Sequence, residues 1–400
     1  MLNAMNTDAL PSKLNTILAR VVVALGVCVL LTAAAVAYLW LRPPSEAQGA
    51  RQIAYTAVGT EGSLDLYLAD PAGRTIKPLT QTPEHEVYPA WSPDGKMLAF
   101  LRVAATTRGG GDSASGVYLM TLDGDKPVER RLGDLSGFGW VEPAWSPDGR
   151  RVAWLRMVAP GREGGPITGE LVIVNAATLA TETQPLTPTV SATAVSWAPD
   201  GQSLALIAYT GVINVPPGRA PTLPESSPIP VAAWVYRLTD RTLSLAAQDA
   251  TQVRWSPTGE WLAYTNVEKG NGVRLVRPDG TGGHALLERG YVMDLAWSPD
   301  GARLAATAWD DGQGAYVLYI YTLEDGTAAT FPIAGDRQSS PQDLAWSPDG
   351  VYLSYSLFWQ GQGLLPDGNL WILDTKTGAL FAFPDNPGLE ALAVWRPGSQ

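Results

Sequence analysis

The sequence predicts an all-β fold made of seven copies of one four-stranded unit. A Trp-Ser-Pro-Asp-Gly motif, which is typical of a turn, recurs along the chain. Short apolar segments with strand-like patterns lie between its copies. Gly and Pro together account for 73 of the 400 residues, and charged residues for only 17%. Such a composition is typical of many short strands joined by tight turns. The hydrophobic content of 46% is enough to build a core, which excludes a disordered chain.

The spacing of this motif gives the period of the repeat. The motif occurs six times as AWSPDG or a close variant, and a degenerate seventh copy, VWRPGS, spans Val394–Ser399. Successive tryptophans are 42 to 58 residues apart, a period typical of repeats of one supersecondary unit. We interpret them as structural wedges between units. The seven tryptophans are Trp91, Trp145, Trp197, Trp255, Trp297, Trp346 and Trp395.

Each unit has the same internal order. An apolar strand ends in the tryptophan, Pro-Asp-Gly forms a turn, and a second strand follows. A variable loop, a third strand, a short turn and a weaker fourth strand complete the unit. Four antiparallel strands per repeat predict the blade of a β-propeller. Because the turn itself needs Pro, Asp and Gly, the motif aspartates are interpreted as structural.

The two ends of the chain predict how the ring closes. The segments that begin at Ile53, Leu64 and Thr75 match the second, third and fourth strands of a unit whose first strand is missing. The segment LEALAVWRPGS near the C-terminus supplies a first strand with nothing after it. We therefore expect both termini to complete one blade, giving seven blades. Six blades remain the alternative if these two pieces do not pair.

The repeated WSPDG followed by an apolar strand resembles the TolB-like β-propeller repeat, a relative of WD repeats. The resemblance covers nearly all of residues 51–400. It implies the propeller scaffold and an extracytoplasmic setting. It does not imply the Tol partners, because this chain has an apolar segment in place of the α/β domain that precedes the propeller in TolB. A fold of this kind hosts many activities, so function does not follow from it.

An uncharged segment near the N-terminus predicts a membrane anchor. Residues 21–41 would reach roughly 31 Å as a helix, which matches the hydrocarbon core of a bilayer. The predicted organisation is a cytoplasmic segment (1–20), a transmembrane signal anchor (21–41), a linker (42–50) and an extracytoplasmic propeller (51–400), in the periplasm or at the cell surface. The alternative is a signal peptide cleaved after Ala35-Val36-Ala37.

Charge and composition exclude several classes of function. The net charge of −11 argues against a nucleic-acid surface. Cys28 is the only cysteine, so the chain has no intrachain disulfide and no cysteine-based zinc site. His85 and His284 are the only imidazoles, and we interpret both as ordinary surface or loop residues. No cofactor and no metal are expected.

Antiparallel pairing fixes which loops share a face of the ring. The Ser-Pro-Asp-Gly turns lie at one end, and the variable second-to-third loops lie at the other with the connections between blades. The variable loops are the expected binding surface. Asp310 and Asp311, together with Asp112, Glu163 or Asp367, form an alternative calcium site, although a solvated loop is favoured. The candidate binding residues are Arg108, Asp112, Arg162, Glu163, Trp309, Asp310, Asp311, Phe358 and Trp359.

Two hypotheses of function remain. The first is a membrane-anchored binding or scaffold propeller that recognises an envelope protein, a membrane complex or a cell-wall component. The second is a hydrolase or lyase that acts on carbohydrate or peptide material in the central channel. The sequence contains no Gly-x-Ser-x-Gly pentapeptide and no catalytic residue is assigned, which favours the first. Convergent carboxylates with a metal or an arginine in the channel would favour the second.

Overall fold

The computed structural model describes residues 51–398 except 60–61, 72–74, 105–114, 123–126, 135–141, 159–164, 167, 187–188, 211–213, 216–230, 267–271, 289, 335–338, 360–367 and 384–389. The segments predicted as cytoplasmic tail, anchor and linker (1–20, 21–41 and 42–50) lie outside the described residues. Within the described part, no helix has the length and apolar character that a bilayer span requires.

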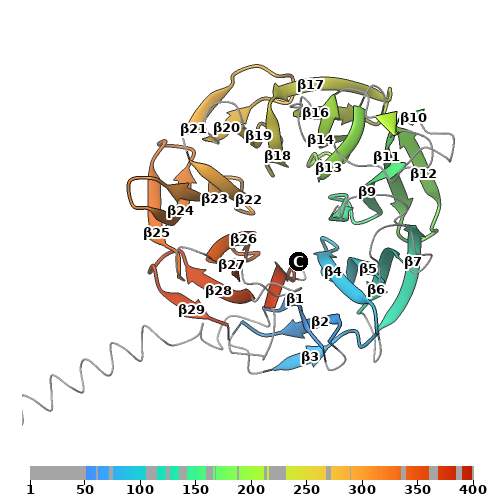
Figure 1. The fold of residues 1–400 in the computed structure, drawn as a ribbon, viewed down its shortest axis with the longest axis horizontal. Coiled ribbons are helices and arrows are strands. Elements are labelled where there is room, and N and C mark those ends of the chain that lie inside the picture. The colour runs from blue at the N-terminus through green and yellow to red at the C-terminus, as the bar shows by residue number, and fades with distance from the viewer. Residues whose placement is uncertain are drawn as a thin grey trace, which may run out of the picture.

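Seven four-stranded antiparallel sheets stand around a central axis, which confirms the predicted seven-bladed propeller (Figure 1). We number the blades in chain order from the first complete one. Blades 1 to 3 are β4 (His85–Trp91), β5 (Met97–Val103), β6 (Gly116–Thr121), β7 (Val128–Asp134); β8 (Ala144–Trp145), β9 (Arg151–Val158), β11 (Thr168–Asn175), β12 (Thr181–Pro185); and β13 (Thr189–Trp197), β14 (Ser203–Thr210), β16 (Val231–Arg237), β17 (Thr242–Gln248).

In each blade the strand that carries the motif tryptophan is innermost. Blades 4 to 6 are β18 (Ala250–Trp255), β19 (Leu262–Asn266), β20 (Gly272–Val276), β21 (His284–Leu287); β22 (Tyr291–Trp297), β23 (Arg303–Asp310), β24 (Ala315–Thr322), β25 (Ala328–Pro332); and β26 (Ser339–Trp346), β27 (Tyr352–Trp359), β28 (Gly368–Asp374), β29 (Leu380–Ala382). The outermost strands are largely exposed, as in β25, whereas the middle strands are buried.

Blade 7 is built from both ends of the chain, as the sequence predicts. Its strands are β30 (Glu390–Trp395), β1 (Ile53–Val58), β2 (Leu64–Ala69) and β3 (Ile76–Pro78). β1 pairs antiparallel with β30, with Ile53 opposite Trp395. The C-terminal strand therefore covers the edge that β1 would otherwise expose, and the ring closes.

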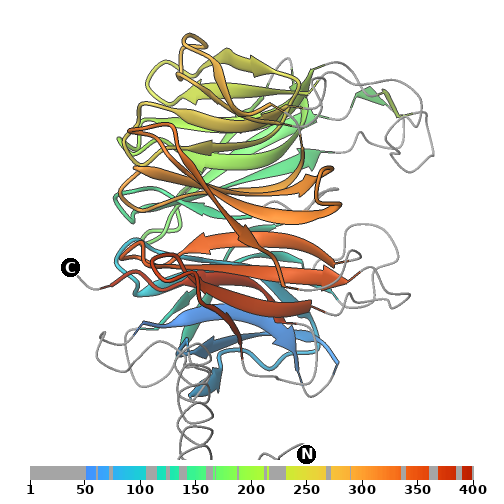
Figure 2. The ribbon, with the colours of Figure 1, turned by 90° about the vertical axis from the view of Figure 1, so that its left-hand side faces the viewer.

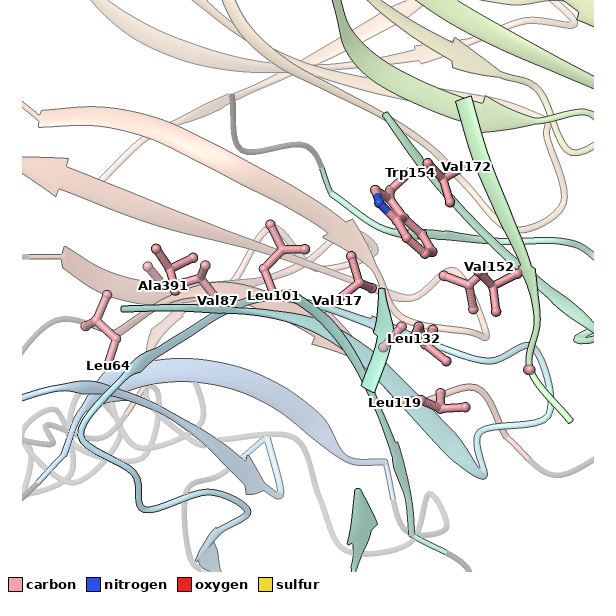
Figure 3. Packing of buried hydrophobic residues seen from close by; sticks show 14 residues of the cluster. Leu64, Val87, Leu101, Val117, Leu119, Leu132, Val152, Trp154, Val172 and Ala391 are labelled. Atoms are coloured by element: carbon pink, nitrogen blue, oxygen red, sulfur yellow. The ribbon is translucent and has the colours of Figure 1, made fainter. Parts of the chain in front are cut away.

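The hydrophobic core lies between neighbouring blades. One cluster joins Leu64 of blade 7, Leu101 and Leu119 of blade 1, and Val152 and Trp154 of blade 2 (Figure 3). Each middle strand contributes side chains to a cluster on either side of its blade, which explains why these strands are apolar on both faces. Stability is consequently spread around the ring.

The motif indoles tie successive blades together by hydrogen bonds. The Trp145 indole donates to the Ala90 carbonyl at 2.9 Å, and the Trp91 indole donates to the Val394 carbonyl at 3.3 Å across the closure. Trp197, Trp297, Trp346 and Trp395 make the same bond to the residue before the tryptophan of the preceding blade. Trp255 differs, because its indole donates to the Gly259 carbonyl of its own turn.

The turn after five of the tryptophans is held by a bond between its own side chains, in blades 1, 2, 4, 5 and 6. In blade 5 the Ser298 hydroxyl donates to the Asp300 carboxylate, which also accepts the backbone N–H of Ala302 at 3.0 Å. The Ser298 hydroxyl, which lowers the pKa of Asp300, acts with this N–H to keep the carboxylate ionised. Gly301 adopts φ of +69°, a conformation that favours glycine.

The two faces of the ring differ, as Figure 2 shows. The chain leaves β30 at one face, on the left of the view. A small sheet of β10 (Gly165–Pro166) and β15 (Asn214–Val215) projects from the opposite face, on the right. Since β10 and β15 belong to second-to-third connections of blades 2 and 3, we call this side the loop face and the other the turn face. The sequence did not predict this small sheet.

Candidate functional site

One position of each repeat, in or just before the innermost strand, lines the central channel. It lies three residues before the motif tryptophan and is occupied by Tyr88, Glu142, Ala194, Gln252, Asp294, Asp343 and Leu392 in blades 1 to 7. We call these the channel positions. Because every blade presents the same position to the axis, residues far apart in the sequence meet there. Three of the seven carry carboxylates.

A local break in strand pairing accompanies the channel positions. The register between β4 and β5 shifts between Val87 and Ala90, and that between β26 and β27 shifts between Gln342 and Ala345. Tyr88 and Asp343 consequently adopt φ of 54° and 57°. Such bulges redirect side chains, and left-handed backbone at non-glycine residues costs of order 1–3 kcal/mol. The rest of the strand pairing holds these two side chains toward the axis.

The channel positions surround a cavity of about 290 Å³. An adjoining cavity of about 160 Å³ shares Tyr88, Glu142, Arg254, Asp294 and Asp343 in its wall and extends toward Leu392. The larger space suffices for a side chain or a small polar molecule. The shared wall makes these five residues the candidate site.

Arg254, which immediately precedes a motif tryptophan, supplies the positive charge of the cavity. Its guanidinium lies 3.7 Å from the Asp294 carboxylate and 4.0 Å from the Glu142 carboxylate. These three residues come from blades 4, 5 and 2, so Arg254 pairs with a neighbouring blade and with a blade that is not its neighbour. One guanidinium faces three carboxylates, and the cavity is therefore acidic as a whole.

Asp294 and Asp343 also connect their blades to the next ones. Asp294 accepts the backbone N–H of Leu344 at 2.9 Å, and Asp343 accepts that of Leu392 at 3.1 Å. Asp294 additionally accepts the backbone N–H of Leu295. Each carboxylate thus has a fixed orientation, which prepares it to act on whatever enters the cavity.

Enclosure shifts the acid–base properties of the cluster. Withdrawal from bulk solvent, reinforced by the Asp294 and Glu142 charges, raises the pKa of Asp343 to about 7. The pKa values of Asp294 and Glu142 are also raised by withdrawal from solvent, although Arg254 opposes this. The Glu142 side chain lines the channel cavity and keeps 58% of its accessible surface, so it is the least withdrawn of the residues in these ion pairs. Burial, together with the Glu142 and Asp343 charges, raises the pKa of Tyr88 to about 12.

The candidate residues chosen from the sequence lie elsewhere. Arg108, Asp112, Arg162 and Glu163 fall outside the described residues, as does Asp367 of the proposed calcium site. Trp309 and Asp310 belong to β23, Phe358 and Trp359 to β27, and Asp311 to the turn after β23. Of these residues, Trp309, Asp310, Asp311 and Phe358 have described side chains, and they line neither of the two channel cavities.

The prediction that Trp309, Phe358 and Trp359 lie in loops is wrong, because both strands extend further than expected. Trp309 pairs with Tyr316 in the sheet, and their rings meet edge to face at 5.2 Å. Asp310 accepts the backbone N–H groups of Gly312 and Gln313 and the Tyr319 hydroxyl, so its carboxylate organises a tight turn. These contacts explain why the strand pairing continues through the polar WDDGQG segment.

His85 also has a structural position. It begins β4, and its Nδ1 accepts the backbone N–H of Leu64 at 2.9 Å, across the junction of blades 1 and 7. Burial lowers the pKa of His85. Within the described part of the chain, no group of three or more His, Cys, Asp or Glu side chains could hold a metal ion.

The channel cluster could have been found from the sequence by one further comparison. Aligning the seven repeats on their tryptophans brings Glu142, Asp294 and Asp343 to the same column. Side chains alternate between the two faces of a strand, so the residues one and three positions before the tryptophan lie on the same face. Arg254, one residue before Trp255, is therefore expected beside the same column. The repeated turns and the variable loops do not by themselves point to this column.

Comparisons with known proteins agree with the fold. The family model of the WD domain, G-beta repeat, matches residues 280–312, from the outermost strand of blade 4 to the second strand of blade 5. TolB from Acinetobacter baumannii is 16% identical and superposes with a TM-score of 0.50 over 92% of this chain and 71% of that chain. No curated protein sequence matches the chain.

Two other propeller structures have different activities in their names. An oligogalacturonate lyase from Vibrio parahaemolyticus is 16% identical, with a TM-score of 0.56 over 83% of this chain and 84% of that chain. Puromycin hydrolase is 17% identical, with a TM-score of 0.59 over 84% of this chain, which spans 53% of that chain. At such identities the likeness shows the fold alone. The class is therefore a seven-bladed repeat propeller with a polar, acidic channel.

Proposed function

We propose that the chain is a membrane-anchored binding propeller, which holds an envelope protein or another envelope component outside the cytoplasm. The convergence of Glu142, Arg254, Asp294 and Asp343 around one cavity on the propeller axis carries this proposal. Concave sites with a few fixed polar groups on a rigid scaffold are where ligands bind. Residues 21–41 would keep this site near the bilayer.

The charge of the channel restricts the class of ligand that it can bind. Three carboxylates and one guanidinium give the cavity an excess of negative charge, and the whole chain carries −11. Polyanions such as nucleic acids or polyuronates would meet repulsion there. Neutral or basic ligands fit this electrostatic environment, so we expect a partner that presents such a group.

The second candidate is a hydrolase or lyase that acts in the channel. The arrangement that favours it is the convergence of carboxylates beside Arg254. With its pKa near 7, Asp343 could donate or accept a proton at neutral pH. Against this role, Asp294 and Asp343 each use an oxygen to bind the next blade. That use is sufficient to account for their presence in a scaffold.

A partner-capture experiment tests the proposal. Full-length tagged chain is crosslinked in its membrane, purified, and compared with the double variant Glu142→Gln/Asp343→Asn and with Glu324→Gln, whose residue lies on an exposed turn. We expect the same envelope partner with the wild type and with Glu324→Gln, and its loss with the double variant. Equal recovery by all three proteins would contradict a role for the channel.

A separate assay tests the enzymatic alternative. Purified chain is incubated with envelope peptides and oligosaccharides, and new amino groups, reducing ends and unsaturated sugars are measured. The binding proposal predicts no turnover above that of the Asp343→Asn variant. Turnover that is lost in this variant and follows the ionisation of a group with a pKa near 7 would establish the hydrolase or lyase instead.

A further inference from the structure

The propeller repeat allows two neighbouring carboxylates to be compared directly. Asp294 and Asp343 occupy the channel positions of blades 5 and 6, and each accepts a backbone N–H from the blade that follows. Asp294 has the Arg254 guanidinium of the preceding blade 3.7 Å away. The structure therefore shows, within this chain, the kind of group that such a carboxylate binds.

Asp343 lacks the equivalent partner because of one residue. The Trp297 indole donates to the Arg254 carbonyl at 3.1 Å, and the Trp346 indole donates to the Ala296 carbonyl at 3.0 Å. Arg254 and Ala296 are thus equivalent positions in blades 4 and 5. A methyl group cannot reach Asp343, and within the described residues Asp343 forms no ion pair with a basic side chain.

Space is present where the missing guanidinium would lie. Asp343 lines both channel cavities, of about 290 Å³ and about 160 Å³. Leu344, Ala345 and Leu392 form part of the smaller cavity wall and add apolar surface beside the carboxylate. This surface suits the methylene groups of a long basic side chain.

The surrounding charges favour a cation at this place. Glu142 and Asp294 both repel the Asp343 carboxylate, and the ion pairs that Arg254 forms are with those two carboxylates. A positive group beside Asp343 would relieve this repulsion. Tyr88 on the same wall adds an aromatic ring, which also attracts cations.

We infer that the channel takes the guanidinium or ammonium group of a ligand beside Asp343, in the place equivalent to that of Arg254 beside Asp294. The inference deepens the proposed binding function, on which it rests, by naming the group that the cavity recognises. A basic side chain of a protein and a free polyamine offer the same chemistry. An arginine-containing peptide, Gly-Arg-Gly, and spermidine separate these two sources in the experiment below.

Calorimetry with matched probes tests the inference. Full-length chain in nonionic detergent is titrated with N-acetyl-argininamide and with N-acetyl-citrullinamide, which has nearly the same shape and no charge. We expect the arginine compound to bind. The citrulline compound should bind with an affinity lower by about tenfold or more, because it cannot form a charge-assisted hydrogen bond. At about pH 7 the titration should release protons, because a cation favours ionised Asp343.

Two variants provide independent checks. Asp343→Asn keeps an acceptor for the Leu392 N–H and should lower the affinity about tenfold or more. Ala296→Arg should place a guanidinium of the chain itself beside Asp343. This side chain should exclude the arginine compound and lower its affinity as much as Asp343→Asn does. Glu324→Gln should bind like the wild type. If Ala296→Arg does not fold, Asp343→Asn alone decides the test.

Specific outcomes would overturn the inference. These are equal binding of the arginine and citrulline compounds, or unchanged affinity in a folded Asp343→Asn variant. Absence of binding by argininamide, the peptide and spermidine would also overturn it. If the partner is still captured through the channel in the crosslinking experiment, the proposed function stands while this inference fails.

Discussion

At the scale of single residues, the seven channel positions differ while the tryptophans that follow them do not. Tyr88, Glu142, Gln252, Asp294 and Asp343 turn a repeated backbone feature into a mixed polar site. The tryptophans repeat because the bond from one indole to the preceding blade is needed at nearly every junction. The residues that the repeats share therefore maintain the fold, and the residues that differ at the channel positions determine the chemistry of the site.

Replacing a motif tryptophan should destabilise the ring strongly. In Trp145→Ala a large aromatic packed against the core of blades 7, 1 and 2 is lost, together with its bond to the Ala90 carbonyl. We expect a loss of about 3 to 5 kcal/mol in the free energy of unfolding, measured by chemical denaturation. A change within the scatter of surface substitutions, about 0.5 kcal/mol, would contradict the wedge role.

The raised pKa of Asp343 predicts how stability depends on pH. Its value of about 7 lies above the ordinary carboxyl range, so between about pH 4 and 7 the folded chain keeps a proton that the unfolded chain releases. The contribution of Asp343 therefore lowers stability as pH rises through this window. Asp343→Asn removes the charge that causes the loss.

The expected result is a variant more stable than the wild type at about pH 8, by at least about 1 kcal/mol, and nearly equal to it at about pH 4. Denaturant midpoints of both proteins at the two pH values provide the measurement. The same difference at both pH values would show that Asp343 titrates as an ordinary exposed carboxyl group.

At the scale of elements, the sequence was sufficient to predict the blades, their order and the closure. Proline, aspartate and glycine in the turns and alternating apolar strands fix these features locally. The extra length of β23 and β27 was missed, because Trp309 and Phe358 stand beside polar residues and gain their strand structure from partners such as Tyr316 and Gly368. The channel cluster is visible only when the repeats are aligned on their tryptophans, since Glu142, Asp294 and Asp343 then share one column. The bulges at Tyr88 and Asp343 have no local signal in the sequence.

Removing β30 should prevent folding of the propeller. A chain that ends at Asn386 lacks the strand that pairs with β1 and the Val394 carbonyl that accepts the Trp91 indole. Blade 7 would then expose an open edge and lose its packing against blade 1. We expect aggregation and no cooperative thermal transition by circular dichroism. A monomer with the thermal stability of the full chain would refute the closure as a requirement for folding.

At the scale of the whole molecule, the proposed anchor and the two faces predict an orientation. Residues 43–50 can span at most roughly 26 to 29 Å, so the propeller should stay near the membrane. The chain enters β1 from the same side on which it leaves β30, since these strands are antiparallel neighbours and Ile53 lies opposite Trp395. The turn face should therefore look toward the bilayer and the loop face away from it.

Single cysteines can test this orientation after Cys28 has been replaced. Gly259 is an unsuitable site, because it has φ of +81° and a Cβ there would lie 3.1 Å from Pro199. Its exposed neighbour Glu260 on the turn face and Asp311 on the loop face are suitable. Depth-sensitive probes in membranes should place position 260 nearer the lipid. The reverse order would contradict the orientation, and with it the outward-facing loop surface.

The most direct test of the binding site follows the ionisation of Asp343 itself. The carboxyl carbon of this residue can be observed by NMR in full-length chain labelled at aspartate, with Asp343→Asn providing the assignment. We predict a pKa near 7, which falls when N-acetyl-argininamide is added and stays unchanged with the citrulline analogue. A pKa near 4 that neither compound changes would contradict the account of the channel as a site for a basic group.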